Sequence, residues 1–75
     1  MKAYRDIDGD SGVAAYEYGP DWIQVDFKTR SVYEYTYASA GQNKIETMKH
    51  LADSGEGLNA LIVKNVKKLY SRRVR

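Results

Sequence analysis

The chain has 75 residues, of which 43% are hydrophobic and 29% are charged. These values predict one small folded domain over residues 1–75, and they exclude a disordered chain and large catalytic scaffolds such as the (β/α)₈ barrel. The formal net charge of +2 conceals an asymmetry, because residues 1–56 hold all ten acidic residues and six basic ones, whereas residues 57–75 hold six basic residues and no acid.

Composition also disfavours disulfide-rich and membrane-spanning proteins. Cysteine is absent, so neither a disulfide nor a thiolate metal site is available. No run approaches the roughly 18 apolar residues of a membrane span, and the first residues lack the apolar stretch of a secretory signal. We therefore expect a cytoplasmic protein with no membrane partner, held together by packing.

The acidic segment at the N-terminus matches the spacing of a calcium-binding loop. Asp6, Asp8 and Asp10 alternate, and Glu17 stands at the twelfth place, in the pattern D-x-D-x-D…E. The sixth place, where such loops need glycine for a sharp turn, is Ser11. An acidic turn exposed to solvent is the favoured interpretation, and no metal site is predicted.

Three segments then predict an antiparallel meander. Residues 13–18, 22–27 and 31–37 are rich in aromatic and β-branched residues, as strands are. Residues 19–21 (Gly-Pro-Asp) have the composition of a tight turn. The second connection is the basic loop at residues 28–30 (Lys-Thr-Arg).

Alternation along these strands divides the sheet into two faces. Tyr33 and Tyr35 are expected to face inward and roof the core. A second interpretation makes them a platform on which unpaired bases stack, so they are also candidate ligand-binding residues. Trp22, Gln24 and Thr36 are expected on the opposite, uncovered face.

Two helices are predicted after the sheet. Ser39 to Gln42 matches a capping box, and apolar residues follow at helical spacing at Ile45, Met48, Leu51 and Ala52. The strongest periodicity begins after Gly57, with Leu58, Leu61, Ile62, Val66, Leu69 and Tyr70. The predicted fold is α+β, with a three-stranded antiparallel meander and two C-terminal helices on one face (βββαα), a core over about residues 8–71 and a basic C-terminal tail at 72–75.

The basic residues near the C-terminus predict a surface for a polyanion. On a helical wheel Lys64, Lys67 and Lys68 form one stripe opposite the apolar one, and Arg72 extends this stripe if the helix continues. Such a stripe binds phosphates with salt-dependent affinity, although a solvated helix face is the alternative. The predicted nucleic-acid-binding residues are Lys64, Lys67, Lys68, Arg72, Arg73, Lys28 and Arg30.

Four short motifs occur in a characteristic order over roughly residues 8–73. They are Tyr16-Glu17, Val25-Asp26-Phe27, Tyr33-Glu34-Tyr35 and the glycine-bounded segment Gly57-Leu58-Asn59-Ala60-Leu61-Ile62. Their order and spacing resemble the KTSC domain, which is named for the C-terminus of some lysyl-tRNA synthetases. The resemblance implies a member of a family without an established activity, for which RNA binding has been suggested from its synthetase context.

The leading hypothesis is a small non-enzymatic module that binds RNA or single-stranded nucleic acid with low sequence specificity. His50 stands alone, and no nucleophile lies beside a base in the sequence, so neither catalysis nor a cofactor is expected. The alternative is a protein-protein interaction module or small inhibitor that docks on a larger partner through Trp22, Gln24 and Thr36 or through the basic helix. Either a monomer or a homodimer fits both hypotheses.

Overall fold

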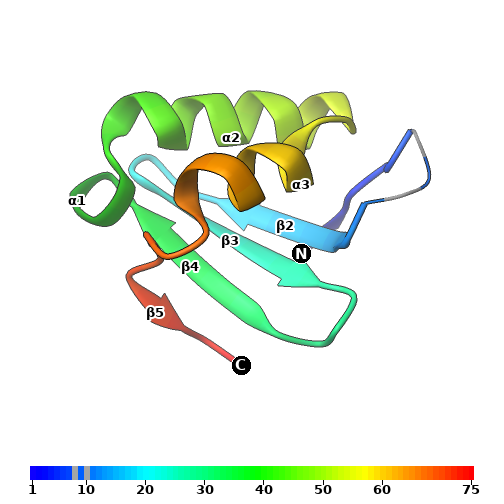
Figure 1. The fold of residues 1–75 in the computed structure, drawn as a ribbon, viewed down its shortest axis with the longest axis horizontal. Helices are drawn as coiled ribbons and strands as arrows, with labels where there is room; N and C mark the ends of the chain where they lie inside the picture. Colours follow the sequence, from blue (N-terminus) through cyan, green and yellow to red (C-terminus); the bar gives the residue numbers. More distant parts are fainter. Residues whose placement is uncertain (8, 10) are drawn as a thin grey trace.

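The fold is α+β, as the sequence predicts, with helices covering one face of an antiparallel sheet (Figure 1). The structure, a computed structural model, describes residues 1–7, 9 and 11–75. The sheet order follows the chain, with strands β1 (Lys2–Ala3), β2 (Val13–Tyr18), β3 (Trp22–Phe27), β4 (Val32–Thr36) and β5 (Arg72–Arg73). The helices are α1 (Tyr37–Ala40), α2 (Gln42–Ser54), α3 (Leu58–Leu61) and the π-helical segment η1 (Ile62–Val66).

The sheet has five strands in the described residues, two more than predicted. β1 pairs with β2, and β5 pairs with β4, so each adds a two-residue edge. Residues 72–75 are therefore not a free basic tail, because Arg72 lies opposite Glu34 and Arg73 lies opposite Tyr33 in the ladder. The predicted core of 8–71 also begins too late, since Tyr4 is only 6% exposed.

A β-bulge in β2 turns the start of that strand toward the core. Val13 pairs with Phe27, whereas Ala15 pairs with Asp26, so Ala14 is the extra residue. The bulge places Val13 on the same face as Tyr16, and Val13 is fully buried. Strict alternation does not predict this, because it assumes one residue per register position.

The first helix starts earlier than the sequence suggests. Thr36 is the N-cap of α1, its hydroxyl accepting from the Ser39 amide at 3.1 Å while the Ser39 hydroxyl accepts from the Thr36 amide at 3.0 Å. Ser39 is thus the fourth and last residue of a capping box, and not its first. Tyr37, predicted as the end of a strand, begins this short helix, and α2 follows after Gly41.

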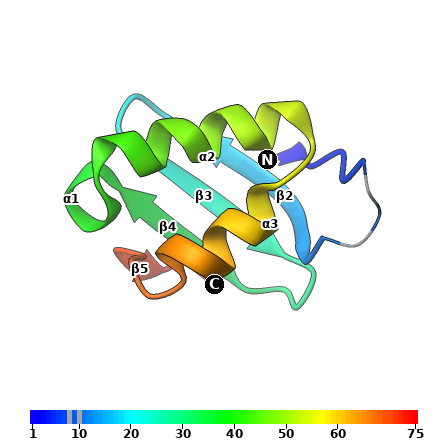
Figure 2. The same cartoon turned by 45° about the horizontal axis from the view of Figure 1, so that its top comes forward.

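The last helical segment is shorter than its apolar pattern predicts. Leu58, Ile62 and Val66 are all buried at 3% exposure or less and are spaced by four residues. The helix widens into π geometry at Ile62 and is finished by Val66. The chain then turns back to form β5 at the edge of the sheet beside β4, while α2 and α3 lie over one face of the sheet (Figure 2).

Tyrosine hydroxyls fasten α2 to the sheet. Tyr16 and Tyr18 on β2 donate to the two carboxylate oxygens of Asp53, at 2.8 and 2.7 Å. In the first half of α2, Glu46 accepts a hydrogen bond from the Tyr37 hydroxyl at 2.6 Å, which connects α2 to α1. The core between these ties contains Tyr4, Val13, Tyr16, Ile23, Val25, Tyr35, Ala40, Ile45, Met48, Ala52, Leu58, Ile62 and Val66.

Candidate functional site

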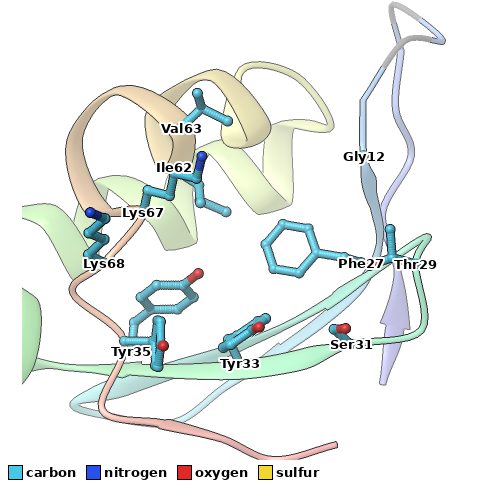
Figure 3. Close-up of a pocket in the computed structure, with 11 residues that line it drawn as sticks. Gly12, Phe27, Thr29, Ser31, Tyr33, Tyr35, Ile62, Val63, Lys67 and Lys68 are labelled. Carbon is cyan, nitrogen blue, oxygen red and sulfur yellow. The ribbon is translucent and has the colours of Figure 1, made fainter.

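A groove opens between η1 and the part of the sheet where β3 turns into β4 (Figure 3). The sheet forms its floor, with Phe27 and Tyr33, and the helical segment forms its roof, with Ile62 and Val63. Its volume is about 450 Å³, within the range of sites that hold small organic groups. The described residues that line it include no acidic side chain.

Two of the predicted phosphate-binding residues lie at this groove. Buried Val66 anchors the end of η1, so Lys67 and Lys68, which follow it, are placed at the rim with their side chains exposed. Among the described residues neither lysine makes an ion pair. Lys64 is exposed on η1 but does not line the groove. Two of the three lysines in the predicted stripe therefore converge on one site.

Tyr33 is the central aromatic residue of the groove. Its ring meets Phe27 edge-on, with centroids 6.0 Å apart, and meets Tyr70 at a tilt of 51°, with centroids 4.7 Å apart. The guanidinium carbon of Arg73 lies 5.9 Å from the same ring centroid. Tyr33 is only half-buried, so a predicted stacking residue is accessible from the groove.

Tyr35 cannot act as the second stacking residue. It lines the back of the groove but is 2% exposed, because β4 carries it beneath the helices. The prediction that it stacks with a base is wrong, since stacking needs an open ring face. Its role is in the core, and burial raises the pKa of its hydroxyl to about 12.

Tyr16 and Tyr35 are expected to ionise late in an alkaline titration. Burial raises the pKa of both to about 12, and the Asp53 carboxylate adds to the effect at Tyr16. Because these pKa values are raised on folding, the stability they contribute is complete below about pH 10 and is lost as the pH rises through 12. The absorbance of tyrosinate measures the ionisation, and Tyr35→Phe should remove part of the absorbance that appears last as the pH is raised. An unchanged late component in that variant would contradict the assignment.

The two arginines of β5 point to opposite faces of the sheet. Arg72 pairs with Glu34, with Nε 3.2 Å from Oε2, on the face away from the helices. This corrects the prediction that Arg72 extends the helical stripe, because the helix has ended before it. Arg73 lies on the groove side, where its guanidinium donates to Ser31 Oγ at 3.3 Å.

The two predicted cations of the β3–β4 turn differ in their surroundings. Lys28 Nζ lies 3.1 Å from Asp6 Oδ2, and this hydrogen bond holds the pKa of Asp6 below its ordinary value. Arg30 is exposed, and its backbone adopts a φ of 70°. Lys28 is therefore engaged within the chain, whereas Arg30 extends from a strained turn next to groove residues Thr29 and Ser31.

Replacing Arg30 with glycine is expected to raise the free energy of unfolding. A left-handed backbone costs a residue with a Cβ about 1–2 kcal/mol, and the greater freedom of glycine in the unfolded chain offsets part of this gain. We expect a net stabilisation of about 0.5–1 kcal/mol, measured by urea denaturation. Arg30→Ala is the control, because it removes the same charge and keeps the strain. Equal stabilities of the two variants would contradict the expectation.

The uncovered face of the sheet is largely occupied by contacts within the chain. The ladder places Trp22 opposite Thr36 and Gln24 opposite Glu34, so the three residues of the predicted protein-binding face do share one side. Gln24 donates to Glu34 at 2.9 Å. The Trp22 indole covers Gly19 so closely that a Cβ there would lie 2.2 Å from Nε1. The Thr36 hydroxyl caps α1.

The calcium-loop pattern is only partly described. Asp8 and Asp10 lie outside the described residues. Asp6 accepts hydrogen bonds from Lys28 and from the Ser11 amide. Within the ranges that the structure describes, no group of three or more acidic, histidine or cysteine side chains is arranged to hold a metal ion.

Sequence reasoning missed Tyr70 and Phe27 as parts of the site. The apolar period from Leu58 predicts Tyr70 on the apolar face of the last helix, and alternation along residues 22–27 predicts Phe27 on the core face with Val25. Lys67 and Lys68 fall on the polar side of the same helical period, so no local signal in the sequence places Tyr70 outside the helix. In the structure the helical segment ends at Val66, and Tyr70 lies in the connection to β5, where it is 43% exposed.

Comparisons with models of protein families, with curated protein sequences and with solved structures found no match for this chain. In the described part of the chain, no helix is both long and apolar enough to cross a membrane.

Proposed function

We propose that this chain is a small non-enzymatic module that binds RNA or another single-stranded nucleic acid with low sequence specificity. The observation that supports the proposal most is the pair Lys67 and Lys68 at the rim of a groove with aromatic walls and no acidic lining among the described residues. Lysines bind phosphates as point charges and release counterions. Low specificity is expected because phosphate contacts carry no base information.

Further cations surround the groove and extend the surface. Arg73 lies over Tyr33, and Arg30 and Lys64 are exposed on the neighbouring turn and helix. Arg72 and Lys28 contribute less in this proposal, because each is paired with a carboxylate. The resemblance to the KTSC domain remains a prediction, and the RNA binding suggested for that family agrees with this proposal.

The alternative of a protein-interaction module is less supported. Its predicted face uses Trp22, Gln24 and Thr36, whose side chains contact Gly19, Glu34 and Ser39 of the same chain. A nucleic-acid strand can approach the groove without breaking these contacts.

Fluorescence anisotropy of labelled single-stranded RNA tests the proposed function. With about three phosphates neutralised, by Lys67, Lys68 and Arg73, raising the salt from about 50 to 200 mM should weaken binding about twentyfold. Saturable binding with this salt dependence supports the proposal. Absence of binding at tens of micromolar protein, or affinity that salt does not change, would contradict it.

A further inference from the structure

We propose that the groove is a site for one unpaired nucleotide, with the base against Tyr33 and the adjoining phosphate at Lys67 and Lys68. This inference rests on the proposed function and specifies which part of the strand enters the protein. It assigns the aromatic residues a role that phosphate binding alone does not require.

The walls of the groove suit a flat aromatic group. Phe27, Tyr33 and Tyr70 supply three rings around one space of about 450 Å³. Nucleic-acid bases stack on tyrosine and phenylalanine whatever their identity, because every base has a π-face. Thr29 and Ser31 place hydroxyls at the turn end of the groove, where they can meet the polar edge of a base or sugar.

The charged residues of the groove favour an aromatic ligand that carries a phosphate. Lys67 and Lys68 are the charged groups among the described lining residues, and both are positive. A neutral aromatic ligand would leave them without a partner, and an acidic peptide without aromatic side chains would place no ring on Tyr33. A nucleotide satisfies both features, because its base and phosphate are separated by a single sugar.

The burial of Tyr35 limits the site to one base. Platforms that bind several bases expose successive rings along a sheet. Here the next inward-facing ring of β4 is 2% exposed, whereas Tyr33 is accessible. The neighbouring nucleotides of a bound strand would therefore contact the protein through phosphates alone.

Three labelled strands of equal length test the inference by anisotropy at low salt. One has no bases, one has a single base at its centre, and one has a base at every position. We expect the single-base strand to bind about tenfold tighter than the abasic strand and within about threefold of the full strand. Equal affinity of the abasic and single-base strands would overturn the one-nucleotide site and leave the proposed function intact. A full strand that binds far more tightly than the single-base strand would also overturn it, and absence of binding by all three would refute the proposed function itself.

Variants of Tyr33 test whether the difference in affinity between the single-base and abasic strands arises in the groove. Tyr33→Leu should bring the single-base strand to the affinity of the abasic strand, whereas Tyr33→Phe, which keeps the ring, should preserve the difference between them. If Tyr33→Phe and Tyr33→Leu lose the difference equally, the base does not stack on this ring. Binding of the abasic strand serves as the internal check that the phosphate contacts of each variant are unchanged, because it depends on the lysines.

Discussion

The double variant Lys67→Glu with Lys68→Glu is expected to bind single-stranded RNA at least about tenfold more weakly than the unaltered chain at 50 mM salt. Glutamates then replace two of the three cations on the groove side, Lys67, Lys68 and Arg73, and they repel the strand instead of attracting it. Each phosphate contact to a single strand contributes about 0.7 to the slope of the logarithm of affinity against the logarithm of salt concentration. The slope should therefore become shallower by about 1.4, which anisotropy titrations over a range of salt measure.

A matched variant separates the groove from the net charge of the molecule. Lys2→Glu with Lys44→Glu changes the formal charge by the same amount, but neither lysine lines the groove or belongs to the proposed binding surface around it. It is expected to slow association through the long-range field and to leave the salt slope nearly unchanged. Equal losses of affinity in the two double variants would show that the strand is attracted by overall charge and not by this site.

The strands could be predicted because their signal is local. β2 and β3 have the predicted bounds, and β4 differs by one residue at each end, because alternating aromatic and β-branched residues between turn residues require no knowledge of the rest of the fold. β1 and β5 have two residues each, too few for a period. They exist because β2 and β4 offer unpaired edges, which only the assembled sheet reveals.

The site could be predicted in part for a related reason. Lys67, Lys68 and Tyr33 were identified from charge and alternation, and the structure brings them to one groove. The placement of Arg72 was wrong because a helical wheel extends a helix at 100° per residue without showing where it ends. The roles of Tyr33 and Tyr35 could not be separated, since both face the same side of β4 and differ only in how far the helices cover them.

Asp53→Ala is expected to lower the free energy of unfolding by about 2 kcal/mol at neutral pH. Local rules disfavour an aspartate here, because it lies in the last turn of α2, where a carboxylate opposes the helix dipole and alanine is the better helix former. The hydroxyls of Tyr16 and Tyr18 offset this, since each hydrogen bond to a charged group contributes about 1.5–3 kcal/mol when it is well shielded. The Tyr18 contact is discounted, because Tyr18 is 41% exposed. Urea denaturation measures the loss.

The pH dependence of this loss identifies its cause. The hydroxyls of Tyr18 and then Tyr16 hold the pKa of Asp53 below its ordinary value of 3.8. A carboxyl whose pKa is lowered on folding contributes stability above its unfolded pKa and loses it as the pH falls through the folded value. The difference between the unaltered chain and Asp53→Ala should therefore shrink below about pH 4.

A double-mutant cycle decides whether the tyrosines are responsible. In a background of Tyr16→Phe with Tyr18→Phe, Asp53 has lost both donors and keeps only its unfavourable position on the helix. Asp53→Ala should then be neutral or stabilising, so the cycle would give a coupling of at least about 2 kcal/mol between the carboxylate and the two hydroxyls. If Asp53→Ala destabilises this background as much as the unaltered chain, the hydroxyl contacts do not fasten α2 to the sheet. In that case α2 would depend on its buried residues alone, Ile45, Met48 and Ala52.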